Sequence, residues 1–155
     1  MPILVVLAAV ALVVGLPHGS GAASSHGSAG AAKSKAKKQK KANKKAQRKI
    51  RNGHYVGTRG DGESVDAIFC KNGAYRTNTG GGISTGKKWV ARSAKFNKKG
   101  FSAIVAENKN PNKGGFSVAI VNRKGQWLYG INSFEEPSSL GKVERTNAKQ
   151  ECEDL

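Results

Sequence analysis

A run of positive charge divides this chain of 155 residues into two unequal parts. Residues 33–51 contain eleven Lys or Arg and no Asp or Glu, and most of the other positions are Ala, Gln and Asn. Ala36, Asn43, Ala46 and Ile50 give the run only a thin, weakly apolar stripe, far from the apolar face of a core helix. The sequence therefore predicts a low-complexity basic arm over residues 24–52 and a folded domain over residues 53–155.

The arm has opposing tendencies toward helix formation. Ala and Lys have high helix propensity, but like charges three and four residues apart repel one another along a helix. We expect an arm that is disordered or frays in water and becomes helical when a polyanion neutralises it. Such an arm should contribute almost nothing to the core.

The charge of the arm predicts an anionic partner. The chain has 27 Lys and Arg against 10 Asp and Glu, a net charge of +17, and eleven of the positive charges lie in the arm. Binding to a polyanion releases its counterions whatever the sequence of the polymer. The alternative is a spacer that only holds the domain away from a surface. The predicted anion-binding residues are Lys33, Lys35, Lys37, Lys38, Lys40, Lys41, Lys44, Lys45, Arg48, Lys49 and Arg51.

Residues 1–23 have the layout of a secretory signal peptide. An uncharged apolar stretch, residues 3–14, is followed by helix breakers and then by small residues that include Gly21 and Ala23. This order predicts cleavage after Ala23 and a secreted or cell-envelope-associated protein with no membrane span in its mature form. An uncleaved anchor is the alternative, although the apolar stretch is shorter than the roughly 20 residues of a bilayer crossing.

Short segments of alternating polarity, separated by Gly-rich turns, begin at Gly53. The turn at residues 123–125 is short enough to require an antiparallel hairpin, whereas residues 79–86 read as a loop. Seven or eight such strands predict an all-β fold, a small antiparallel sandwich or barrel with one buried face. The expected strands cover residues 53–58, 64–70, 74–78, 87–91, 101–106, 116–121, 126–131 and 142–146. The expected core contains Tyr55, Val65, Phe69, Trp89, Phe101, Ile104, Val105, Phe116, Val118, Ile120, Trp127, Tyr129 and Ile131.

Two cysteines, Cys70 and Cys152, predict a disulfide, because an even number of cysteines in an exported chain favours pairing. Closing a loop of about 80 residues would stabilise the fold by roughly 4 kcal/mol in the chain-entropy model. His54 is the only histidine of the domain, and there is no Cys-x-x-Cys. We therefore expect no metal site and no cofactor.

Three short motifs are weak. Residues 81–88 nearly match the phosphate-binding loop G-x4-G-K-[ST], but Lys88 stands where a hydroxyl belongs and no helix pattern follows. Residues 59–61 read Arg-Gly-Asp, a tripeptide that cell-adhesion receptors recognise, yet Gly-Asp-Gly is ordinary turn chemistry. The acids of the domain are scattered, so nothing selects the facing pair of a glycosidase. We expect no nucleotide site and no catalytic residues.

These features favour an exported, non-enzymatic binding protein. Its arm would contact a cell envelope, an acidic polysaccharide, lipid headgroups or extracellular DNA, and would tether a small β domain there. The alternative is a small-ligand carrier with a lipocalin-like β-barrel cavity, and a small secreted hydrolase comes third. A ligand-sized cavity inside the barrel would favour the carrier, and a filled interior would favour the binding protein.

Overall fold

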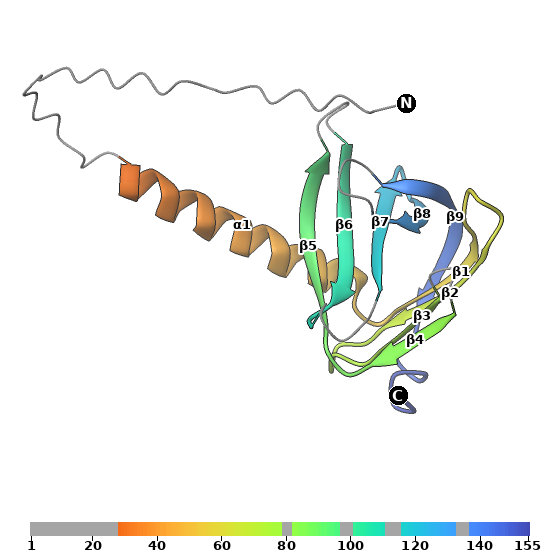
Figure 1. Cartoon of the computed structure of the whole chain (residues 1–155). Helices are drawn as coiled ribbons and strands as arrows, with labels where there is room; N and C mark the ends of the chain where they lie inside the picture. Colours follow the sequence, from red (N-terminus) through yellow and green to blue (C-terminus); the bar gives the residue numbers. More distant parts are fainter. Residues whose placement is uncertain (1–27, 79–81, 97–100, 111–115, 133–136) are drawn as a thin grey trace, which may run out of the picture.

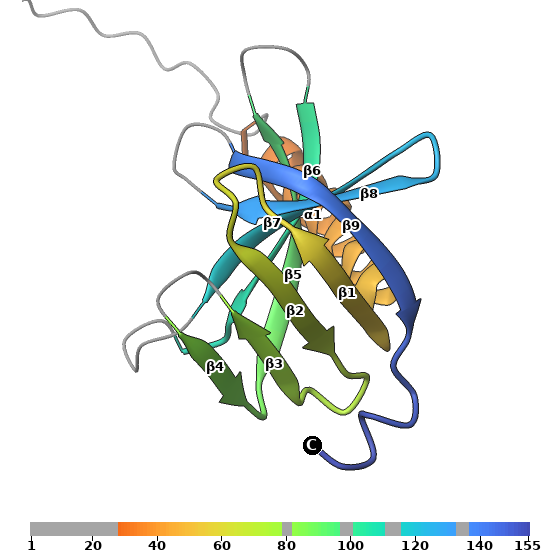
Figure 2. The ribbon, with the colours of Figure 1, turned by 90° about the vertical axis from the view of Figure 1, so that its right-hand side faces the viewer.

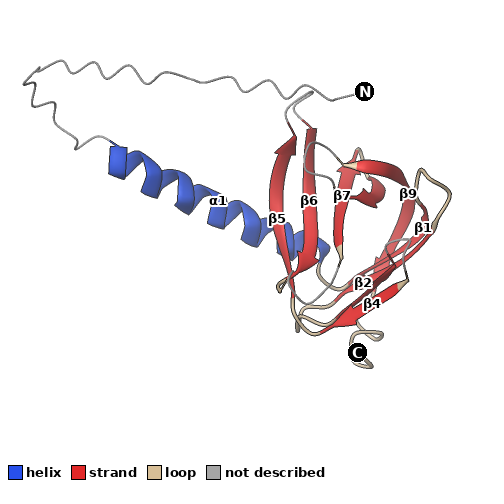
Figure 3. Ribbon diagram, viewed as in Figure 1, coloured by secondary structure: helices blue, strands red, loops and turns tan. Residues whose placement is uncertain are grey.

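The computed structural model describes residues 28–78, 82–96, 101–110, 116–132 and 137–155, and shows a long helix and a curled antiparallel sheet (Figures 1 and 3). The predicted signal peptide and its cleavage site at Ala23 lie outside the described residues. Among the described residues, no helix has both the length and the hydrophobicity that a membrane span requires.

The helix, α1, spans Ser28–Ile50, and nine strands follow it in the described residues. The strands are β1 (Gly53–Thr58), β2 (Ser64–Phe69), β3 (Tyr75–Asn78), β4 (Ile83–Gly86), β5 (Trp89–Phe96), β6 (Phe101–Asn108), β7 (Ser117–Arg123), β8 (Gln126–Ile131) and β9 (Ser138–Asn147).

All nine strands belong to one antiparallel sheet with the order β4-β3-β2-β1-β9-β8-β7-β6-β5. The sheet curls into a half-barrel, with β1 and β9 side by side at its middle and β4 and β5 at its edges (Figure 2). The β prediction is thus confirmed in its coarse form, and the arrangement is a single curled sheet.

The hairpin predicted at residues 123–125 is present between β7 and β8. Arg123 pairs with Gln126, so the loop consists of Lys124 and Gly125 alone. Both loop residues have positive φ, 50° and 85°, as the tight turns that match the twist of paired strands require.

The loop expected at residues 79–86 is wrong for its second half, where β4 pairs with β3. The Gly-rich composition suggested a loop, but at position 86 the packing of the sheet requires glycine. A Cβ atom on Gly86 would lie 2.7 Å from the Tyr75 ring, so the buried tyrosine leaves room for glycine only. Residues 79–81 lie outside the description.

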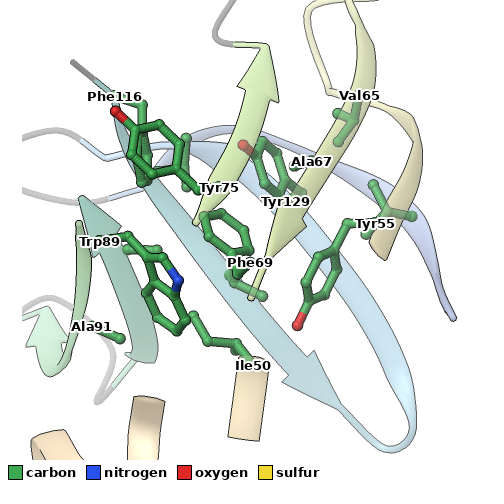
Figure 4. Close-up of a cluster of buried hydrophobic side chains, with 14 residues drawn as sticks. Ile50, Tyr55, Val65, Ala67, Phe69, Tyr75, Trp89, Ala91, Phe116 and Tyr129 are labelled. Carbon is green, nitrogen blue, oxygen red and sulfur yellow. The ribbon is translucent and has the colours of Figure 1, made fainter. Parts of the chain in front are cut away.

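The main core fills the concave side of the sheet with aromatic side chains (Figure 4). Phe69 lies at its centre, with ring centroids 5.4 Å from Trp89, 5.7 Å from Phe116 and 6.0 Å from Tyr55. The predicted core residues found buried are Tyr55, Val65, Phe69, Trp89, Val105, Phe116, Val118, Ile120 and Tyr129, while Ile104 and Trp127 are partly buried against them. Val105 belongs to a second cluster, with Phe96, Ala103, Ala119 and Val121, that does not include the concave-side aromatics.

Candidate anion-binding surface

The basic helix is docked on the sheet by two neutral amides. Asn43 accepts a hydrogen bond from the Ser93 backbone N–H at 3.0 Å, and Gln39 donates one to the Ser93 carbonyl at 3.0 Å. Gln39 also donates to Asn43 at 2.9 Å. Ser93 belongs to β5, an edge strand whose outward backbone groups have no neighbouring strand. The two side-chain amides therefore make hydrogen bonds to Ser93 that a further strand would otherwise make.

The last turns of the helix enter the core. Ala46 is 5% exposed and Ile50 is fully buried, in the same cluster as Phe69 and Trp89 (Figure 4). The expectation that the arm contributes almost nothing to the core is therefore wrong for this end. Residues 30–41, by contrast, are exposed, and this part of α1 extends beyond β5 (Figure 1).

Docking sorts the arm cations by direction. Asn43, Ala46 and Ile50 define the inner face, and the 3.6-residue period of a helix places a second set along one side of the helix, about 120° around its axis from that face. We call this set the outer stripe, and its members follow one another at intervals of three or four residues and are all exposed. The outer stripe consists of Lys33, Lys37, Lys40, Lys44, Arg48 and Arg51.

The other five arm cations lie on the remaining side of the helix. Lys49 places its Nζ atom 5.5 Å from the centre of the Trp127 ring, on which Arg145 also lies at 5.5 Å. Lys45 and Lys49 line a groove of about 270 Å³ between the helix and β5, β6 and β7. Lys35, Lys38 and Lys41 are exposed. The structure thus places ten of the eleven predicted anion-binding residues on α1 and Arg51 directly after it.

None of these cations is neutralised by a carboxylate in the described part of the chain. Two acids of the sheet have partners of their own. Asp66 contacts His54 at 2.9 Å and Arg76 at 3.1 Å, and Glu107 lies 3.5 Å from Arg92. The positive field of the helix is therefore available to an external anion.

Asn52 ends the helix and orients it. Its φ of 51° is left-handed, a conformation that Asn tolerates and that closes many helices. Its side-chain oxygen accepts a hydrogen bond from the Lys71 N–H at 2.9 Å, and its carbonyl accepts one from the Ala148 N–H at 3.0 Å. In the sequence, Asn-Gly after a basic last turn is a signal for the end of a helix. It does not indicate the two distant partners, Lys71 and Ala148.

The predicted disulfide between Cys70 and Cys152 is present, with its Cα atoms 5.5 Å apart. It lies in a small apolar cluster with Ile68, Ala74 and Ala148. The bond therefore joins the end of β2 to the C-terminal segment close to the residues that Asn52 contacts.

The weak motifs of the sequence have structural roles. Arg59 is 5% exposed and donates two hydrogen bonds to Asp61, at 3.0 and 2.8 Å, so its guanidinium is not presented to a receptor. These bonds hold the pKa of Asp61 below its usual value. The near match to a phosphate-binding loop leads into strand β5. Among the described residues, no cluster of three or more His, Cys, Asp or Glu could hold a metal ion.

Comparisons with protein-family models, with curated proteins and with solved structures find nothing that matches this chain.

Proposed function

We propose that this chain is an exported, non-enzymatic protein that binds an anionic polymer or surface through its basic helix. The observation that carries the proposal is the outer stripe, which lines up six cations without a carboxylate partner among the described residues. A helix rises 1.5 Å per residue, so the stripe extends over roughly 27 Å. Docking at Ser93 and Ile50 holds half of this length against the sheet, which reduces the entropy lost on binding.

A small-ligand carrier has less support. The concave side of the half-barrel, where a lipocalin-like cavity would lie, is filled by Tyr55, Phe69, Phe116 and Tyr129, all buried. The groove between the helix and the sheet could hold a small ligand, which favours a carrier. Lys45 and Lys49 line this groove, however, so it is not the apolar cavity that a lipocalin-like carrier needs. The interior thus favours a binding protein whose ligand contacts the outside.

Export is part of the same proposal. Residues 1–23 have the order of a signal peptide, and a disulfide is typical of proteins in oxidising compartments. Protein recovered from the culture medium should begin at Ser24, which an intact-mass measurement tests. A secreted product that retains the apolar stretch at residues 3–14 would contradict the cleavage prediction.

A salt titration on an immobilised polyanion tests the binding. The variant replaces Lys33, Lys37 and Lys40 by Gln, and all three side chains are exposed and lie outside the core. The matched control replaces Lys109, Lys124 and Lys142 by Gln, which are exposed in or next to the strands, so that both proteins have the same net charge.

The stripe variant should bind at least tenfold more weakly than the control. On a duplex polyanion, its log–log slope against salt should be shallower by about one unit for each phosphate that the variant no longer neutralises. If both triple variants lose affinity equally, net charge alone governs binding and the stripe is not the site. If neither loses affinity, the arm acts as a spacer.

A further inference from the structure

A small basic pocket lies where the end of the helix meets the turn between β2 and β3. Its volume is about 200 Å³. It is lined by Lys44, Gln47, Arg48, Arg51, Lys71 and Trp89. Three of these residues belong to the outer stripe, whereas Lys71 comes from the turn between β2 and β3, so the pocket exists only in the folded protein.

The residues that line the pocket are mostly basic. Four of the six residues are cations, and no acid is among them. None of the four is paired with a carboxylate within the described residues. Gathering like charges around a concavity is unfavourable unless an anion occupies it. The Trp89 indole N–H already donates to the Cys70 carbonyl at 2.8 Å, so the charged donors of Lys and Arg remain for a ligand.

The helix end and the turn at Lys71, which form the two sides of the pocket, are each fixed by contacts outside the pocket. Asn52 follows Arg51 directly and accepts a hydrogen bond from the backbone of Lys71. Cys70, the neighbour of Lys71, is bonded to Cys152. The cations of the helix and of the turn therefore face the pocket in a preorganised arrangement, which lowers the cost of binding.

We propose that this pocket binds a pendant monoester oxyanion, a sulfate or phosphate group, on the polymer that the outer stripe contacts. The proposal rests on the proposed function, because the polymer must lie along the stripe to deliver the group. A tetrahedral oxyanion offers three terminal oxygens, enough for the bidentate forks of Arg48 and Arg51 together with Lys71. A group that projects from its chain can enter a concave site, whereas a diester phosphate has substituents on both sides. The observations thus favour a sulfated or phosphorylated polysaccharide over nucleic acid.

The decisive variant is Lys71→Gln, compared with Lys124→Gln as a control for one lost charge at another exposed turn. The Lys71 hydrogen bond that supports the fold is made by its backbone N–H, which the variant keeps. Three ligands are titrated: a sulfated oligosaccharide, a uronic-acid polymer with carboxylates only, and a DNA duplex. Lys71→Gln should weaken binding of the sulfated oligosaccharide about tenfold, the loss expected for one charge-assisted hydrogen bond. The other two ligands should respond to both variants equally.

Inorganic sulfate and inorganic phosphate test the pocket without the polymer. The chain has two Trp, so Trp127→Phe leaves Trp89 as the sole indole reporter. Its fluorescence should change saturably with either ion and should not do so after Lys71→Gln. A response to phosphate alone would identify the phosphomonoester as the group, and a response to sulfate alone would identify the sulfate ester.

The outcomes separate the two proposals. If Lys71→Gln matches Lys124→Gln on all three polymers, or weakens DNA as much as the sulfated chain, the pocket proposal is overturned and polyanion binding stands. If instead the triple variant of Lys33, Lys37 and Lys40 binds polymers like its control, the stripe is overturned, whatever the inorganic ions do.

Discussion

Asn52 connects three parts of the molecule, namely the end of the helix, the turn at Lys71 and the C-terminal segment at Ala148. It does so from a left-handed backbone conformation that few side chains adopt without cost. Fewer residue types therefore fit at position 52 than at the exposed positions of the basic run.

Substitution of Asn52 should separate its two contributions. Asn52→Ala loses the side-chain hydrogen bond and strains the backbone, so the free energy of unfolding should fall by about 2 kcal/mol. Asn52→Gly loses the hydrogen bond but adopts positive φ freely, so the fall should be about 1 kcal/mol. Urea unfolding at an unchanged m value measures both. Equal stability of the three proteins would show that the helix terminus does not depend on Asn52.

Tyr55 gives the fold a dependence on alkaline pH. Burial raises its pKa from 10.0 to about 12, although the charge and hydrogen bond of Arg145 act in the opposite direction. The folded state therefore holds the phenol proton more tightly than the unfolded state. This contribution to stability is complete below pH 10 and is lost as the pH rises through about 12.

Stability measured from neutral to alkaline pH should thus fall less steeply in Tyr55→Phe than in the intact protein. Some alkaline loss should remain, because burial also raises the pKa of Tyr129. Thermal unfolding at several pH values provides the comparison. Parallel curves for the two proteins would show that Tyr55 does not titrate with unfolding.

At the scale of elements, the helix has two halves with different roles. Gln39, Asn43, Ala46 and Ile50 bind it to the sheet, whereas residues 30–38 are exposed. Under the proposed function, the first half serves binding only, and the second half serves both binding and folding. The sequence analysis did not predict the docking role of these amides, because their partner Ser93 lies 50 positions beyond Asn43.

Two truncations test this division. A chain that begins at Gln39 should keep its melting temperature within about 1 °C, since residues 30–38 are exposed and bury nothing in the core. A chain that begins at Asn52 loses Ile50, which alone should cost about 2–4 kcal/mol, and leaves Ser93 without its amides. Its melting temperature should fall by more than about 5 °C. Equal melting temperatures of the two truncated chains would mean that the whole helix is a dispensable arm.

At the scale of the molecule, the ends of the domain are joined twice. β1 and β9 pair at the middle of the sheet, and the disulfide ties Cys70 to a residue 82 positions later. Both connections join residues that are far apart in the sequence, and the disulfide also restricts the unfolded chain.

Removal of the disulfide should therefore lower stability while it preserves the fold. Cys70→Ala with Cys152→Ala should cost roughly 2–4 kcal/mol, a fall of several degrees in melting temperature. Alanine suits the buried apolar site better than serine, because it leaves no polar group unsatisfied. A thiol assay on unfolded, unreduced protein should find no free thiol, and two reactive thiols would contradict the pairing.

Features that depend on near neighbours in the chain could be predicted from the amino-acid sequence. Alternating polarity located most strands, Lys124 and Gly125 specified their hairpin, and the even cysteine count indicated the disulfide. The tertiary structure alone decided which distant residues meet. It placed Gly86 against Tyr75, amides of the arm against Ser93, and Lys71 beside Arg48 and Arg51. A local pattern reports periodicity and turn chemistry, whereas these contacts depend on the curl of the whole sheet, to which residues from both ends of the domain contribute.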